Sequence, residues 1–307
     1  MTKQFIEIAQ LSNEDLAEIY AAARRATRGD ELHDWNISLV FEFPSLRTRA
    51  SSVAAVQRLG ANYSMFSGDE VGIDSRESAE DVARTLAQTS DVIALRVRSH
   101  GVFERMLSAT NNSVHLINLL SNQTHPTQAV ADVLTLADAF SGGDVDALSG
   151  RRLAYVGDAT NVTRSLATAL VRLGVTVQVA APRGYQLSDA DVATINALAR
   201  RGGALVQMED PADAVRGVDA VYTDSWISMG LEGEAAERRR LFSSYQVNAR
   251  LMGLAGPEAV VLHCLPAHRG EEITTEVMAL PSSLVWQQVR HRTSSMVGVL
   301  MWMRGAP

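Results

Sequence analysis

Short apolar runs that end in polar residues recur along the whole chain, and this alternation restricts the possible folds more than any other pattern. The runs are rich in Val, Ile and Leu, as strands buried on both faces are. They lie at residues 37–41, 91–97, 114–119, 152–156, 175–180, 220–223 and 260–263, and helical patterns separate most of them. Strands that alternate with helices predict an α/β fold with parallel sheets, whose strand ends carry the polar groups.

The chain has one segment with the composition of a linker, SGGDVDALSG at residues 141–150. A length of 307 residues, 46% of them hydrophobic, is sufficient for two domains. We therefore predict two doubly wound α/β domains with parallel sheets and an active site in the cleft between them. Their predicted limits are 1–140 and 150–287, and a C-terminal helix of about 288–307 is expected to pack back onto the first domain.

Charge and composition exclude several classes of protein. A net charge of −7 does not fit a nucleic-acid surface, which needs a basic stripe. The chain shows neither an apolar run long enough to span a membrane nor a secretory signal, so a cytoplasmic location without membrane contact is expected. Cys264 is the only cysteine and Lys3 the only lysine, which excludes an internal disulfide, a P-loop lysine and a pyridoxal phosphate site.

The stretch FEFPSLRTRA, residues 41–50, combines several devices that bind anions. Ser45 has the chemistry of an N-cap before a helix at 46–59, whose first-turn amides point at the cap. Thr48 adds a hydroxyl. Arg47 and Arg49 add guanidinium groups on different faces of the helix, so we expect only one of them to reach the anion. The alternative for this decapeptide alone is a capped helix with two solvated arginines.

Polar residues at the other strand ends divide into two chemical sets. The first half contributes cations and hydrogen-bond donors suited to a phosphate and an adjacent carbonyl, and the second half contributes groups suited to an amino-acid zwitterion. These residues are Arg96, His125 and Gln128 in the first half and Asn161, Asp224, Ser228 and Cys264 in the second. The turn GDATNVTRS has one glycine, so it does not match a dinucleotide fingerprint. The combination predicts group transfer.

At these residues the chain resembles the aspartate and ornithine carbamoyltransferase family over nearly its whole length. The family motif S-T-R-T-R appears as SLRTR at residues 45–49, H-P-x-Q as residues 125–128, and H-C-L-P as residues 263–266. Residues 224–230, DSWISMG, resemble the D-x-W-x-S-M-G loop of ornithine-type members. Asn161 stands where those members have the second Asn of a G-D-x-N-N turn.

The resemblance implies that carbamoyl phosphate transfers its carbamoyl group to the δ-amine of ornithine, giving citrulline and phosphate in arginine metabolism. The catalytic residues would be Arg96, His125, Asp224 and Cys264. Carbamoyl phosphate would contact Ser45, Leu46, Arg47, Thr48, Arg96, His125, Gln128, Cys264, Leu265 and Arg292. Ornithine would contact Asn161, Asp224, Ser228 and Met229. The resemblance further implies a homotrimer or a multiple of trimers, and no metal or other cofactor.

Some residues depart from the family pattern. Leu46 replaces a Thr, Phe43 replaces a Lys common in ornithine-type enzymes, and Thr160 replaces the first Asn of the turn. The loop 69–78 lacks the Gln or His that the family sends into a neighbouring site. Two alternatives to ornithine transfer therefore stay open. One is a paralogue that acts on putrescine, an acylated ornithine or an amino acid of secondary metabolism, and the other is a catalytically weak regulatory relative.

Overall fold

The computed structural model describes residues 2–25, 27–227 and 232–305. Contacts between residues divide the chain into two units, one formed by 1–134 and 290–307 and the other by 135–289. Each unit contains a five-stranded sheet whose strands pair in parallel, so the predicted pair of α/β domains with parallel sheets is confirmed. The predicted domain limits stay a prediction. Within the described ranges, no helix is both long enough and apolar enough to cross a membrane.

The first unit is built on a sheet with the strand order β1-β5-β4-β2-β3. Its elements are β1 (Gln4–Phe5), α1 (Asn13–Ala23), β2 (Asn36–Phe41), α2 (Leu46–Arg58), β3 (Asn62–Ser67), α3 (Gly68–Val71), α4 (Ala79–Leu86), β4 (Val92–Arg96), α5 (Gly101–Thr110) and β5 (His115–Leu120), a 3-10 turn at Ile8–Gln10, and most of α6 (Pro126–Ser141) and α13 (Val285–Arg304). Every residue of β4 is buried, as expected for a strand that lies between β2 and β5.

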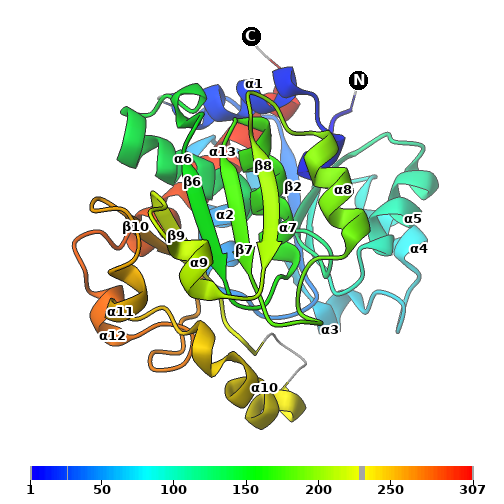
Figure 1. The fold of residues 1–307 in the computed structure, drawn as a ribbon. Coiled ribbons are helices and arrows are strands. Elements are labelled where there is room, and N and C mark those ends of the chain that lie inside the picture. Colours follow the sequence, from blue (N-terminus) through cyan, green and yellow to red (C-terminus); the bar gives the residue numbers. More distant parts are fainter. Residues whose placement is uncertain (1, 26, 228–231, 306–307) are drawn as a thin grey trace. The chain divides into compact units, whose positions relative to one another are not determined.

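The two ends of the described chain meet in the first unit (Figure 1). Lys3 Nζ donates a hydrogen bond to the carbonyl oxygen of Trp302 at 2.7 Å, and Trp302 Nε1 donates to Asp15 Oδ1 at 2.9 Å. Gly298 lets α13 approach α1 closely, because a Cβ at this position would lie 2.5 Å from the carbonyl oxygen of Ile19. The C-terminal part of α13 therefore packs against the first helix of the chain.

The second unit is built on a sheet with the order β10-β9-β6-β7-β8, and Figure 1 shows β6, β7 and β8 side by side. Its elements are β6 (Arg152–Val156), α7 (Asn161–Arg172), β7 (Thr176–Ala180), α8 (Asp189–Ala197), β8 (Ala204–Met208), α9 (Pro211–Val215), β9 (Ala220–Thr223), α10 (Ala235–Phe242), α11 (Ala249–Met252), β10 (Val260–His263) and α12 (Thr275–Met278), with 3-10 turns at Asp146–Leu148, Glu232–Glu234 and Ser243–Tyr245.

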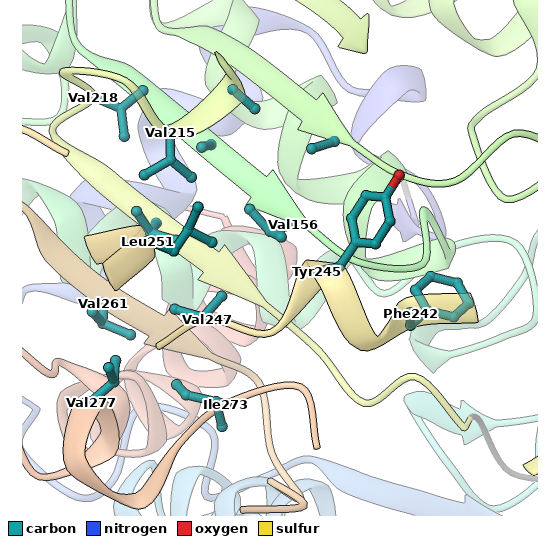
Figure 2. Close-up of a cluster of buried hydrophobic side chains, with 14 of the residues drawn as sticks. Val156, Val215, Val218, Phe242, Tyr245, Val247, Leu251, Val261, Ile273 and Val277 are labelled. Carbon is teal, nitrogen blue, oxygen red and sulfur yellow. The ribbon is translucent and has the colours of Figure 1, made fainter. Parts of the chain in front are cut away.

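One core cluster of the second unit joins its sheet to the helices near the end of the chain (Figure 2). Val156 of β6 and Val261 of β10 belong to this cluster together with Val277 of α12. Phe242 and Tyr245, at the end of α10 and in the turn that follows, pack at an edge-on angle with ring centroids 5.9 Å apart. This packing attaches α10 and the turn after it to the sheet.

Two local predictions were wrong or incomplete. The Gly, Ser and mixed charges around residues 69–76 predict a mobile loop after a strand, but Gly68–Val71 form a helical turn. Ser67 and Glu70 close this turn with a capping box, and Gly72 ends it at a φ of 60°. The run of charges in the segment 231–245 predicts a solvated helix or lid, yet Arg238 in α10 is 3% exposed. This charged segment therefore contains a buried arginine.

Candidate active site

Each sheet has one place where the order of its strands reverses, between β2 and β4 in the first unit and between β6 and β9 in the second. Open α/β sheets bind ligands beyond the carboxyl ends of the strands at such a point. β2 ends at Phe41, whose register partner is Arg96, the last residue of β4. β9 ends at Thr223, whose Oγ1 donates to the carbonyl oxygen of Val156 at the end of β6, at 2.7 Å.

The start of α2, the helix that follows β2, has the geometry of an anion-binding site. Ser45 is the N-cap of α2, as predicted, with an extended backbone, and its side chain makes no capping hydrogen bond. The amide groups of the first helical turn have no acceptor within the helix. Leu46, the first helical residue, is 80% exposed, so its side chain contributes little to the core. The sequence PSLRTR thus forms the start of a helix whose amides can donate hydrogen bonds to an anion.

One arginine of the C-terminal helix joins three of the predicted residues. Arg292 Nη2 donates to Thr48 Oγ1 at 2.8 Å, and Arg292 Nη1 donates to His125 Nε2 at 3.0 Å and to Gln128 Oε1. Gln128 in turn donates from Nε2 to Asp132 Oδ1 at 2.7 Å. All five residues are buried. Side chains from α2, α6 and α13 therefore form a single hydrogen-bonded network.

This network determines the proton position on His125. A guanidinium group has donors only, so Nε2 of His125 accepts the hydrogen bond from Arg292, and the ring proton lies on Nδ1. Burial lowers the pKa of His125 well below its ordinary value of 6.5. The positive charges of Arg292, Arg96 and Arg47 lower this pKa further. His125 is therefore a neutral imidazole among cations.

The two arginines of the decapeptide have different surroundings. The charge of Arg47 acts on His125, whereas the guanidinium of Arg49 packs 5.4 Å from the centroid of the Phe41 ring. Arg49 is also exposed. Arg47 is thus the one that joins the cluster of cations.

A second buried network holds the loop before His125 and was not found from the sequence. His100 contacts Glu7 through Nε2 at 2.8 Å and Ser121 Oγ through Nδ1 at 2.8 Å. Ser121 and Thr124 also bond to each other through the backbone, and Asn118 donates to Thr124 Oγ1 at 2.8 Å. These contacts fix the path of the chain from the end of β5 to the start of α6. A signal for them was absent because their residues are spread over the whole first unit.

In the second unit, Asn161 and Asp224 follow the two strands of the reversal point. Asn161 is the first residue of α7, and its Oδ1 accepts from the amide of Val162 at 2.9 Å. Asp224 Oδ1 accepts from the amide of Ser225 at 2.8 Å. Removal from water raises the pKa of Asp224, and the neighbouring His263 and a hydrogen bond from Cys264 partly oppose this rise. The carboxylate, the amide and the thiol therefore belong to one edge of the sheet, as predicted.

His263 is held in one orientation by both of its ring nitrogens. Nδ1 accepts from the amide of Leu265 at 2.8 Å, so the ring proton is on Nε2, which lies 3.1 Å from Glu272 Oε1. His263 and Glu272 are both completely buried. Leu265 has a φ of 62°, and its peptide bond to Pro266 is cis. The H-C-L-P segment is therefore anchored at its first residue.

Arg238 of α10 forms a buried ion pair that the sequence did not indicate. Its Nη2 pairs with Asp158 Oδ2, and its Nε donates to the carbonyl oxygen of Trp226. The guanidinium also packs on the rings of Tyr185 and Phe242, at 4.9 and 5.4 Å from their centroids. Burial raises the pKa of Asp158 to about 6, although the charge of Arg238 opposes this rise. Arg238 thus connects the turn after β6 with the loop after β9.

The described residues include two groups whose ligand atoms lie within 4.8 Å of one another, Asp224 with His263 and Cys264, and His268 with Glu271 and Glu272. In the first group both nitrogens of His263 already have hydrogen-bond partners. This group is therefore poorly suited to bind a metal ion through histidine.

The predicted site residues are distributed over both units. Ser45, Leu46, Arg47, Thr48, Arg96, His125, Gln128 and Arg292 belong to the first unit, and Asn161, Asp224, Cys264 and Leu265 to the second. The predicted ornithine contacts Ser228 and Met229 lie outside the described residues.

Comparison with protein families matches both halves of the chain. Residues 3–138 match the carbamoyl-P binding domain of aspartate/ornithine carbamoyltransferase, and residues 149–303 match the Asp/Orn binding domain of the same family.

Individual relatives agree with the family match. The chain is 40% identical to an ornithine carbamoyltransferase of Hyperthermus butylicus, over 97% of this chain and 96% of the relative. It is 38% identical to an ornithine carbamoyltransferase of Symbiobacterium thermophilum, over the same shares of both chains. The solved ornithine carbamoyltransferase of Pyrococcus furiosus superposes with a TM-score of 0.91 at 34% identity, covering 100% of this chain and 98% of that one. This chain therefore belongs to the aspartate/ornithine carbamoyltransferase family.

Proposed function

We propose that this protein transfers the carbamoyl group of carbamoyl phosphate to the δ-amine of ornithine, which gives citrulline and phosphate. The observation that carries this proposal is the buried network in which Arg292 binds Thr48, His125 and Gln128 beside the start of α2. It combines donors for a carbonyl group with a helix start suited to phosphate. The relatives named above, which share 38 to 40% of their residues with this chain, support ornithine as the acceptor.

Most of the groups that would bind carbamoyl phosphate belong to the first unit. The amide of Leu46, the hydroxyls of Ser45 and Thr48, and Arg47 would contact the phosphate, and Arg96 would bridge phosphate and carbonyl oxygen. Gln128, Arg292, the carbonyl oxygen of Leu265 and Cys264 would contact the carbamoyl end. Leu46 can still offer its amide in place of a hydroxyl.

The carbonyl oxygen would be polarised by donors that point at it. Arg292 is a donor in the observed arrangement, and Thr48 Oγ1 accepts from it, which leaves the hydroxyl proton of Thr48 to donate to the substrate. Nε2 of His125, in contrast, accepts from Arg292. His125 would therefore donate to substrate only after its proton moves to Nε2 or its contact with Arg292 changes. Loss of one such donor typically slows a reaction by about 10²- to 10³-fold.

The second unit would bind ornithine. Asp224 and Ser228 would contact the α-ammonium, and Asn161 with the amide of Met229 would contact the α-carboxylate. A parallel strand end that offers a carboxylate and an amide suits both charges of an amino acid.

The reaction requires a neutral δ-amine. An alkyl ammonium has a pKa of roughly 10 in water, so the site must take up its proton before attack. Asp224 and Cys264 are the candidate acceptors, and the raised pKa of Asp224 makes its carboxylate a stronger base. The amine then forms a C–N bond to the carbonyl carbon, the C–O bond to phosphate breaks, and the second amine proton passes to the departing phosphate.

The assembly and location are part of the same proposal. The resemblance favours a homotrimer or a multiple of trimers, a cytoplasmic enzyme of arginine metabolism, and catalysis without a cofactor. Light scattering on the active enzyme tests the assembly, and a fully active monomer would contradict it.

A substrate panel tests the acceptor. The protein is incubated with carbamoyl phosphate and, separately, with ornithine, putrescine and an acylated ornithine, and the carbamoylated product and phosphate are measured. We expect citrulline from ornithine at the highest kcat/KM. A preference for another amine would contradict ornithine as the acceptor, and no turnover with any amine would contradict the enzyme activity itself.

A further inference from the structure

The ring of Phe43 packs against the guanidinium group of Arg96. Cζ of Arg96 is 4.4 Å from the centroid of the ring, and Cζ of Arg98 is 5.8 Å from it. Both distances lie within the roughly 6 Å over which a cation is attracted to an aromatic face. Arg96 is only 6% exposed, so water screens this attraction little.

Backbone contacts bring Phe43 to this position. Phe41 and Arg96 are register partners at the ends of β2 and β4. Beyond them the amide of Glu42 donates to the carbonyl oxygen of Arg96 at 3.0 Å, and Glu42 Oε2 accepts from the amide of Arg98 at 2.6 Å. The two segments therefore continue side by side past the sheet, and Phe43 is the next residue after Glu42.

We propose that Phe43 is a positioning residue that holds the Arg96 guanidinium in the plane in which it binds carbamoyl phosphate. This inference rests on the proposed function, because that function assigns Arg96 to this substrate. A guanidinium binds an oxyanion through donors that lie in one plane, so its orientation matters as much as its charge. A ring packed on one face fixes this plane and removes rotamer freedom before the substrate arrives.

A neutral ring also suits the charge of the site. Arg47, Arg96 and Arg292 already act together on His125. Another cation at position 43 would add repulsion to this cluster, whereas an aromatic face attracts the cation and adds no net charge.

The proposal predicts that KM for carbamoyl phosphate depends on the electron density of the Phe43 ring. If the ring acted through packing alone, KM would not depend on this electron density. Replacing Phe43 with phenylalanine analogues that carry one, two, three and five fluorine atoms withdraws electron density from the ring face in steps and changes its shape little. We expect KM for carbamoyl phosphate to rise with each step, by about 3- to 30-fold at the fully fluorinated ring. KM for ornithine should stay unchanged, which also reports an intact fold.

Two natural substitutions complete the series. Phe43→Tyr keeps an aromatic face and should retain a KM near that of the wild type. Phe43→Leu keeps an apolar side chain without a ring and should resemble the fully fluorinated protein.

The matched control is Phe140 in the second unit, whose ring centroid lies 4.7 Å from Cζ of Arg151. The same fluorinated series at Phe140 should leave KM for carbamoyl phosphate unchanged. An equal rise in both series would overturn the proposal, because the effect would then be general to fluorination.

Arg96→Ala, measured in parallel, separates this inference from the proposed function. A flat series at Phe43 together with a raised KM in Arg96→Ala means that Phe43 does not position Arg96, and the proposed function stands. An unchanged KM in Arg96→Ala removes Arg96 from the carbamoyl phosphate site, and this inference fails with that assignment.

Discussion

Arg292 donates a hydrogen bond from Nη1 to Nε2 of His125 at 3.0 Å, although 167 positions separate the two residues in the sequence. Its other terminal nitrogen reaches Thr48 at 2.8 Å. A permanently charged donor at this nitrogen opposes protonation of the imidazole, in the same direction as burial. The pair therefore keeps a neutral histidine at the start of α6.

The neutral state of His125 should appear in the pH dependence of stability. The unfolded chain binds a proton on this residue near pH 6.5, whereas the folded protein does not. Above pH 6.5 the low pKa of His125 therefore does not affect the free energy of unfolding. Below pH 6.5 the free energy of unfolding falls with the pH, by up to about 1.4 kcal/mol per pH unit. We expect His125→Gln to lose less stability than the wild type between pH 7.5 and pH 5, measured by urea unfolding.

The control for this experiment is the exposed His33. His33→Gln should follow the wild type at both pH values. If His125→Gln also follows the wild type, His125 takes up a proton in the folded protein.

The two arginines of the anion-binding helix start should differ in their effect on carbamoyl phosphate. Arg47→Ala removes a charge-assisted contact to a dianion, so we expect KM for carbamoyl phosphate to rise by roughly 10- to 150-fold. Arg49→Ala, the matched control, removes the same charge from a residue that packs on Phe41, and should change KM little. Arg47→Lys should restore part of the affinity only, because a point charge does not reproduce a planar fork. Initial-rate kinetics with saturating ornithine distinguish the variants, and equal effects at both positions would contradict the assignment.

Breaking the ion pair between Arg238 and Asp158 should destabilise the second unit in a pH-dependent way. Arg238→Met leaves a buried carboxylate without its partner, a change that typically costs about 3 to 5 kcal/mol. The raised pKa of Asp158 means that the folded state already holds this proton more tightly than the unfolded chain, so stability from this group falls as the pH rises from 4 to about 6. Loss of Arg238 raises the pKa further and extends this fall to higher pH.

We therefore expect the stability difference between the wild type and Arg238→Met to be larger at pH 8 than at pH 5. Thermal unfolding of both proteins at both pH values measures this difference. Arg239→Met is the matched control, since the neighbouring arginine has a side chain that is 52% exposed and pairs with Glu271 at the surface. A loss in Arg238→Met that is the same at both pH values would show that the variant fails through packing alone.

Asp224 should select the amino acid and leave carbamoyl phosphate binding nearly intact. Asp224→Asn loses the charge pairing with the α-ammonium of ornithine, so binding of the unreactive analogue norvaline should weaken while carbamoyl phosphate still binds. In the wild type, putrescine lacks the α-carboxylate and leaves its partners unpaired, at about 1 to 3 kcal/mol per buried group, or roughly 10- to 100-fold or more in kcat/KM. Calorimetry with both ligands checks the first outcome and the amine panel the second. An equal loss for both ligands would remove Asp224 from the amino-acid site.

The sequence by itself determined the features that depend on neighbours along the chain. The apolar run before FEFPSLRTRA is a buried strand, and Ser45 stands at the N-cap position of the helix that follows it. The spacing of Ser12 and Asp15 likewise predicts the capping box that these two residues form. Burial on both faces, a fixed backbone at a cap and a short side-chain hydrogen bond all act within a few residues. The same locality identified the polar residues at strand ends, because parallel strands place these ends at one edge of a sheet.

Only the tertiary structure decided which of these polar groups meet, and in which protonation state. The surrounding EGEAAERRR does not reveal that Arg238 is buried, since its partner Asp158 lies 80 positions earlier. Nor does the motif at residues 125–128 reveal that an arginine from the last helix fixes the proton on His125. The energy of a buried charge depends on the partners and the water around it, and the fold brings these together from distant parts of the chain.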